Sequence, residues 1–250
     1  MLVVVLAGCG GHGAGTAARL KTADGTAAEL QTADGTAAGL KTADGTAVGL
    51  EAVRAGRSSS LRAERPLTAA EWESLRGLAG LRELVLEHGR ADDAHALILA
   101  TLPDLERLVL RESPLGDEGF RRLAGIRKLR DLNVPQAACT AEGIRTLAAL
   151  PALRVLRLGG PNLARQEGGG PEVCRAVATL AGLRSLHLID VPIGDAGLET
   201  LAGLPGLWNL YLDGAGVSDE AWAGYFRRCP DVHVHVDQAH HDRDPNAHDH

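Results

Sequence analysis

A 24-residue spacing of leucine segments runs through most of the chain. The first leucine of each L-x-x-L-x-L segment falls at position 81, 105, 129, 153, 183 or 207, so the steps are 24, 24, 24, 30 and 24 residues. The alternating end of each segment predicts a short strand with one buried face. A valine version at Val232, Val234 and Val236 ends the series. A fixed period of this length predicts an array of similar units.

Between these strands the apolar residues recur three positions apart, as in Trp72, Leu75 and Leu78. This spacing predicts an amphipathic helix of about three turns in each unit. Residues whose side chains suit a helix N-cap precede four of these stretches: Thr68, Asp92, Thr140 and Ser218.

One strand and one helix cannot bury their apolar faces alone, so neighbouring units must stack. We therefore predict an α/β solenoid over residues 57–236, right-handed, with a parallel sheet on the concave side and helices on the convex side. The segments LGDEGF (115–120), IGDAGL (193–198) and VSDEAW (217–222) resemble the leucine-rich repeat family, in its ribonuclease-inhibitor-like and cysteine-containing subtypes. Six extra residues near Ala164–Gly169 predict a surface loop on one repeat.

The rest of the chain divides into three segments. Residues 16–56 hold a ten-residue repeat, with units such as LKTADGTAAE, that is rich in Ala, Thr, Gly and Asp. We predict a disordered linker there, with a small β-solenoid as the alternative. Residues 1–15 are a candidate lipoprotein signal, and residues 237–250 form a tail rich in His and Asp.

The N-terminal segment has three interpretations. Leu6-Ala7-Gly8-Cys9 resembles the lipobox of bacterial lipoproteins, which implies a lipid on Cys9 and a location at the cell envelope. The residues before Cys9 include no Lys or Arg, unlike the opening of most signal peptides. The pattern G-x-G-x-x-G from Gly8 to Gly13 is typical of dinucleotide binding, but no second apolar strand follows. The third interpretation is a flexible terminus without function in a cytoplasmic protein.

Composition and motifs exclude several classes of function. The net charge of −6 and the pI near 5.9 argue against nucleic acid as the partner. No apolar run reaches the roughly 20 residues that span a bilayer, so a lipid anchor is the only link to a membrane that we predict. The sequence has no G-x-S-x-G, H-E-x-x-H or P-loop motif, so we predict that the protein is not an enzyme and has no cofactor. Cys139 and Cys174 fall at apolar positions of the repeat and are predicted to be core residues.

Residues beside the buried leucines are predicted to point from the concave face. Glu83, Arg107 and Asp131 alternate in charge there, as do Glu87 and Arg111, which predicts cross-strand ion pairs.

We predict that an unidentified protein or peptide contacts the concave face of a monomer, through these residues: Arg107, Arg157, His187, Tyr211, Asp213 and His235. The alternative is an ordinary exposed polar surface. A further alternative resembles the leucine-rich substrate-recognition subunits of ubiquitin ligases, although no F-box-like segment precedes the repeats.

The C-terminal end suggests a second class of function, an extracytoplasmic metal-binding protein. The candidate ligands are His233, His235, His240 and His241, in a region where weak binding of Zn, Cu or Ni is expected. Asp242, Asp244 and Asn246 resemble the start of a calcium loop, but Ala247 replaces the required glycine. The alternative is a solvated, disordered tail.

Overall fold

The computed structural model describes residues 19–21, 27–29 and 45–244. In that part of the chain, nine strands form one sheet in which chain neighbours are also sheet neighbours. All pairings from β3 to β10 are parallel, whereas β11 pairs antiparallel with β10. The strands are β3 (Ser60–Ala63), β4 (Glu83–Leu86), β5 (Arg107–Leu110), β6 (Asp131–Val134), β7 (Val155–Gly159), β8 (Ser185–Ile189), β9 (Asn209–Asp213), β10 (His233–Val236) and β11 (Ala239–His240).

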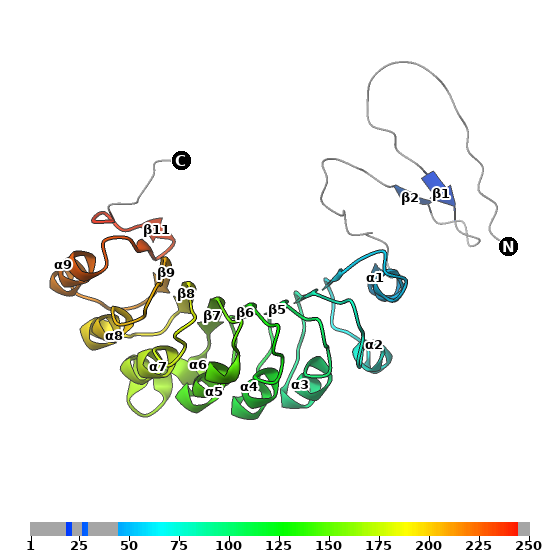
Figure 1. The fold of residues 1–250 in the computed structure, drawn as a ribbon, viewed down its shortest axis with the longest axis horizontal. Coiled ribbons are helices and arrows are strands. Elements are labelled where there is room, and N and C mark those ends of the chain that lie inside the picture. Colours follow the sequence, from blue (N-terminus) through cyan, green and yellow to red (C-terminus); the bar gives the residue numbers. More distant parts are fainter. Residues whose placement is uncertain (1–18, 22–26, 30–44, 245–250) are drawn as a thin grey trace, which may run out of the picture.

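One helical segment or more separates each pair of consecutive parallel strands. Figure 1 shows the helices along the outer rim of an arc and the strands along its inner rim, so the sheet forms the concave face. The helices are α1 (Gly45–Arg54), α2 (Ala69–Leu75), α3 (Asp93–Leu99), α4 (Asp117–Leu123), α5 (Ala141–Thr146) with a 3-10 turn at Leu147–Ala149, α6 (Pro161–Arg165), α7 (Gly169–Val177), α8 (Gly194–Leu201) and α9 (Asp219–Arg228).

The leucines of the repeat fill the space between the sheet and the helices. Those at the middle of six successive strands are register partners and fully buried: Leu84, Leu108, Leu132, Leu156, Leu186 and Leu210. Full burial of a leucine side chain contributes about 1.5–3 kcal/mol, and here it depends on the neighbouring repeat. The predicted α/β solenoid is therefore confirmed, and its architecture is that of a leucine-rich repeat protein.

The helices begin where predicted, but most of them end earlier than predicted. All four predicted N-cap side chains accept a backbone N–H of their helix: Thr68, Asp92, Thr140 and Ser218. However, α3 ends at Leu99, and Leu102 lies in the turn that follows. The prediction of about three turns is wrong for α3 and the other short helices, because 24 residues must also hold a strand and the two connections between strand and helix. In α3, Pro103 also prevents the helix from continuing. Helix α9, with ten residues, has about the predicted length.

The folded part of the chain begins before residue 57. Helix α1 lies within residues 16–56, where a disordered linker was predicted, and its Leu50 and Val53 are buried in the same core as Leu61 of β3. For the α1 residues the structure therefore differs from that prediction. Thr46, Leu50 and Val53 follow the i, i+4, i+7 spacing of a helix face, which explains this packing. Farther upstream, β1 (Arg19–Lys21) and β2 (Ala27–Glu29) pair antiparallel.

The six extra residues do not form a loop throughout. Ala164 and Arg165 close the short helix α6, and Gly169 begins α7. Between these helices, the side-chain Oε1 of Gln166 accepts a hydrogen bond from the Ala141 backbone N–H at 2.8 Å. The insertion is thus hydrogen-bonded to the preceding repeat. The predicted surface loop is limited to residues 166–168, between the two helices.

Aspartates link successive repeats on the helical side. Each lies in or near the first turn of one helix and accepts a backbone N–H at the start of the next helix. The pairs are Asp93 with Gly116, Asp117 with Thr140, and Asp195 with Ser218, at distances of 2.7, 2.7 and 2.8 Å. A carboxylate near a helix N-terminus also interacts favourably with the helix dipole.

We expect Glu71 to make the stability of the first repeats depend on acid pH. The two guanidinium nitrogens of Arg65 bind its carboxylate at 2.9 and 2.6 Å, and the Thr68 backbone N–H adds a third bond, so the pKa of Glu71 falls from 4.5 to about 2. A lowered pKa stabilises the fold above the unfolded-state pKa, and this contribution is lost as the pH falls from about 4.5 towards 2.

The substitution Glu71→Gln should therefore cost about 1 kcal/mol in the free energy of unfolding at pH 7. Urea unfolding of both proteins between pH 7 and pH 2.5 measures this difference. It should shrink as the pH falls below about 4.5. A difference that is constant with pH would contradict the ion pair. Glu73→Gln, at an exposed carboxylate whose one ion pair in the described chain is with Arg76, is the matched control.

Candidate functional site

Residues beside the leucines form straight columns across the concave face. The pairings of β6 to β10 place Asn133, Arg157, His187, Tyr211 and His235 opposite one another in that order. Neighbouring strands lie about 4.8 Å apart, so successive side chains of this central column are in reach of each other. The register therefore places five residues that flank the buried leucines in one row across neighbouring strands.

In the N-terminal half of the concave face, the charged side chains neutralise each other. Arg107 lies between Glu83 at 3.4 Å and Asp131 at 3.5 Å. Glu87 receives Arg111 at 3.1 Å and also pairs with Arg62. The predicted cross-strand ion pairs of this half are therefore present. Such exposed pairs contribute little to stability, and they leave no strong local charge for a partner.

Burial affects the carboxylate at the C-terminal end of this ladder. Partial burial raises the pKa of Asp131, and the nearby Glu83 acts in the same direction, while Arg107 opposes both.

A groove opens in the C-terminal half of the concave face. Its volume is about 480 Å³. All six predicted contact residues line it: Arg107, Arg157, His187, Tyr211, Asp213 and His235. The other lining residues come from β6 to β8 and from the turn after β10: Asp131, Asn133, Val155, Leu156, Ser185 and Gln238. The structure thus brings the predicted contact set together at one place.

Two buried polar atoms at the centre of the groove lack a hydrogen-bond partner in the described chain, namely Nε of Arg157 and Oδ1 of Asn133. One is a donor and the other an acceptor, and they belong to register partners on β7 and β6. Among the described residues, no carboxylate forms an ion pair with Arg157, whereas the concave arginines Arg62, Arg107 and Arg111 are all paired. A buried polar group without a partner costs about 1–3 kcal/mol, so this pair of atoms favours a polar ligand.

The far wall of the groove is aromatic and is held by one hydrogen bond between His187 and Asp213. The Tyr211 ring lies between the rings of His187 and His235, with centroid distances of 5.5 and 4.8 Å. The Nε2 atom of His187 lies 2.8 Å from a carboxylate oxygen of Asp213. Burial lowers the pKa of His187, and the positive charge of Arg157 adds to this, although Asp213 acts in the opposite direction. These contacts fix the orientation of the Tyr211 wall.

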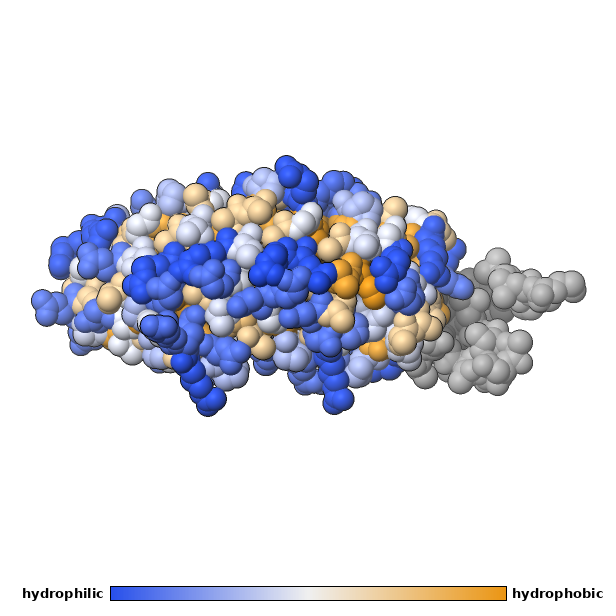
Figure 2. Space-filling view, turned by 90° about the horizontal axis from the view of Figure 1, so that it is seen from below, coloured by the Kyte–Doolittle hydropathy of each residue, from blue (hydrophilic) through white to orange (hydrophobic). Residues whose placement is uncertain are grey.

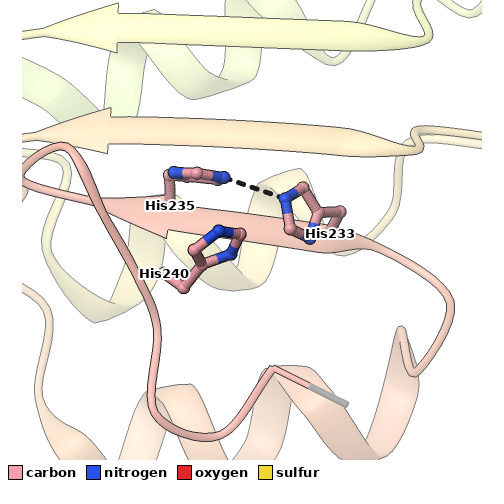
Figure 3. Close-up of side chains that lie close together, drawn as sticks. All are labelled: His233, His235 and His240. Carbon is pink, nitrogen blue, oxygen red and sulfur yellow. Dashed lines mark hydrogen bonds between the residues drawn. The ribbon is translucent and has the colours of Figure 1, made fainter. Parts of the chain in front are cut away.

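Three histidines gather at the C-terminal edge of the sheet (Figure 3). His233 and His235 come from β10 and His240 from β11, and one ligand atom of each lies within 4.8 Å of the others. The Nε2 atoms of His233 and His235 are 2.8 Å apart. Burial lowers the pKa of His235, with the neighbouring His240 and His233 adding to the effect.

The fourth predicted ligand, His241, lies elsewhere. Its ring packs on Trp222 at 4.7 Å and Phe226 at 5.1 Å between centroids, against α9. Adjacent residues of a strand-like segment point to opposite sides, which separates His241 from His240.

Asp244 belongs to the cluster, although the sequence did not predict it there. Its side chain is fully buried, and its Oδ2 atom lies 2.8 Å from Nδ1 of His233 and accepts the Val234 backbone N–H at 2.8 Å. The first part of the tail therefore turns back onto β10, unlike the solvated, disordered tail that was the alternative. The only sequence signal was the spacing of acidic residues in the tail, which resembled a calcium loop.

The remaining predicted residues fall into two groups. Cys139 and Cys174 are fully buried core residues, as predicted, and burial raises the pKa of the Cys174 thiol to about 12. Cys9, with the lipobox, lies outside the described residues, and its lipidation stays a prediction. Among the described residues, no helix combines the length and the apolar character that a bilayer crossing requires.

Comparisons with known proteins find similarity among solved structures. No family model matches the chain, and no curated protein does so either. Among solved structures, an internalin from Listeria monocytogenes is similar with a TM-score of 0.42 and 16% sequence identity. The alignment covers 77% of this chain and 64% of the internalin, so the chain spans less than two thirds of that protein's length.

Proposed function

We propose that this protein is a non-catalytic interaction module whose concave groove binds a polypeptide segment bearing an acidic side chain. The observation that carries the proposal is Arg157, a half-buried cation at the centre of the groove with no carboxylate partner in the described chain. A guanidinium in this state pairs best with a carboxylate, which it can bind through two parallel hydrogen bonds.

The second buried atom specifies the chemistry further. Arg157 Nε requires an acceptor on the ligand, and Asn133 Oδ1 requires a donor on the ligand. The two groups must lie close together, because the two residues are register partners on neighbouring strands. A peptide offers both, because its backbone N–H can donate to Asn133 while an acidic side chain accepts from Arg157. The ring of Tyr211 supplies an apolar wall beside them, of the kind enriched at binding hot spots.

The convex face offers less for docking. Figure 2 views the molecule from this side and shows mainly hydrophilic residues, with apolar ones in small separate areas. The concave face instead rests on continuous, parallel strands whose leucines are fully buried. A surface held this rigidly loses little conformational entropy on binding, which favours affinity.

The experiment selects ligands from random sequences, so it requires no known partner. A library of random peptides displayed on phage is selected on the immobilised full-length chain, and the enriched peptides are synthesised. Each peptide is then titrated against the wild-type protein, Arg157→Ala and Arg62→Ala. Arg62 is the matched control, because it continues the same column of the concave face but is already paired with Glu87.

We expect the enriched peptides to share an Asp or Glu. Their dissociation constant should rise at least about tenfold for Arg157→Ala, which corresponds to about 1.4 kcal/mol, and should change less than about twofold for Arg62→Ala. Peptides that lack an acidic residue, or that bind Arg157→Ala as tightly as wild type, would rule out the groove as the docking site.

A further inference from the structure

A site of a different kind lies beside the groove, at the edge of the sheet. We propose that His233, His235 and His240 bind one divalent transition metal ion of the zinc class. Imidazole nitrogens are favoured ligands for Zn²⁺, Cu²⁺ and Ni²⁺, and three of them with an open fourth position are a common zinc arrangement. The three rings converge on one side of the β10–β11 pair (Figure 3), and their ligand atoms already lie within 4.8 Å of one another.

His233 is held in the form that a metal ligand needs. A neutral imidazole has an N–H donor on one ring nitrogen and an acceptor lone pair on the other, whereas the buried carboxylate of Asp244 can only accept a hydrogen bond. We therefore assign the proton of His233 to Nδ1, which lies 2.8 Å from Asp244, and the lone pair to Nε2, which faces His235. A carboxylate behind a histidine ligand is a recurrent feature of zinc sites, where it fixes the tautomer and raises the basicity of the ligand.

The Asp244 carboxylate is itself fixed in place. It also accepts the Val234 backbone N–H at 2.8 Å, so it is oriented by the same strand that carries His233 and His235. This arrangement holds the first ligand rigidly before any ion arrives, which lowers the entropic cost of binding.

Binding would replace the hydrogen bond between the two histidines of β10. His235 donates this bond through Nε2–H, so to ligate through Nε2 it must take the other neutral tautomer, with its proton on Nδ1. The nitrogens, now 2.8 Å apart, would separate to roughly 3.3 Å around a tetrahedral ion with Zn–N bonds of about 2.0–2.1 Å. This pair would move apart by about half an ångström, and ligand atoms that now lie as much as 4.8 Å apart would approach to the same spacing. Rotation of the rings can supply both movements, because all three histidines are partly exposed.

The ligands belong to two strands, and this gives the ion a structural effect. His235 is the register partner of His240 in the antiparallel β10–β11 pair that ends the sheet. An ion bound by both strands would join β11 to β10, the last parallel strand of the solenoid. The folded state alone holds the three ligands together, so the ion should raise the unfolding temperature with increasing concentration.

The test measures metal binding to the full-length protein without an affinity tag. Zn²⁺ is titrated by calorimetry at pH 7.5, and Co²⁺ is added separately because its visible absorption distinguishes tetrahedral from octahedral coordination. The variants are His240→Asn and His235→Asn, with His88→Asn as the matched control, since His88 is an exposed histidine that follows β4. Circular dichroism and thermal unfolding without metal establish that each variant folds.

A double variant, His248→Ala with His250→Ala, removes the last two histidines of the chain. We expect one ion per chain, a tetrahedral Co²⁺ spectrum, and an affinity reduced at least tenfold in His240→Asn and in His235→Asn. The control and the double variant should bind as tightly as wild type.

Three results would overturn the proposal. They are the absence of Zn²⁺ binding by the wild-type protein, an octahedral Co²⁺ spectrum, and loss of binding in the double variant but not in His240→Asn. The third result would assign binding to the end of the tail. If one cluster variant fails to fold, the other variant and the wild-type Co²⁺ spectrum still decide between these outcomes.

Discussion

Replacing Gly160 by alanine should destabilise the solenoid by more than about 3 kcal/mol, because the site excludes a side chain in two independent ways. Gly160 has φ of +138°, a backbone conformation that residues with a Cβ rarely adopt. A Cβ placed there would also lie 2.0 Å from the carbonyl oxygen of Ala137 in the preceding repeat. The backbone at Gly160 cannot shift easily to relieve this contact, because Gly160 directly follows β7, the strand that carries Arg157.

Urea unfolding measures this effect, and Gly77→Ala is the matched control. Gly77 also has a positive φ, of +65°, but nothing lies within 4 Å of the position of its Cβ. The control should therefore cost only about 1 kcal/mol, from backbone strain alone. Equal losses for the two variants would contradict the close approach of the two repeats at Gly160.

The second large effect is expected for Asp117→Ala, which should cost about 2–3 kcal/mol. The Asp117 carboxylate accepts hydrogen bonds from the Thr140 backbone N–H at 2.7 Å, from the Thr140 hydroxyl at 2.9 Å and from the Gly143 N–H at 3.1 Å. Its removal leaves these partly buried donors without their acceptor and separates helix α4 from the N-terminus of α5. Hydrogen bonds to a charged group contribute about 1.5–3 kcal/mol each, although their sum is reduced by access of water.

Asp219 provides the control for this prediction. It occupies the corresponding place in α9, the last helix of the described chain, but it is exposed and no further repeat follows it among the described residues. Asp219→Ala should therefore change the free energy of unfolding by less than about 0.5–1 kcal/mol, which is the usual effect of a charge in the first turn. If both substitutions cost the same, the carboxylates act only on their own helices and do not link repeats.

The regular part of the fold could be predicted in detail because two periods act together. The period of two fixes which side chains of a strand point to the concave face, and the period of 24 fixes which of them are neighbours. The central column from Asn133 to His235 follows from those two periods once the six-residue insertion between Arg157 and His187 is counted. The ion-pair ladder around Arg107 follows from the two periods directly. The N-cap residues could be predicted for a local reason, since the cap bond joins residues two or three positions apart.

Features that depend on contacts between distant residues could not be predicted in this way. The unpaired state of Arg157 follows from which carboxylates reach it, and the sequence does not show those distances. Asp244 meets His233 because the chain reverses after β10, and no apolar pattern marks that reversal. Helix α1 is a different case: Thr46, Leu50 and Val53 have the spacing of a helix face, but they lie within residues 16–56, whose composition predicts a linker.

The most direct test of the binding account is the coupling free energy between Arg157 and the acidic residue of a selected peptide. A double-mutant cycle combines Arg157→Ala with replacement of that acidic residue by its amide, and compares four dissociation constants. We predict a coupling of at least about 1 kcal/mol for Arg157 and close to zero for the same cycle with Arg62→Ala. A coupling near zero at Arg157 would contradict the claim that this unpaired cation receives the partner in the concave groove.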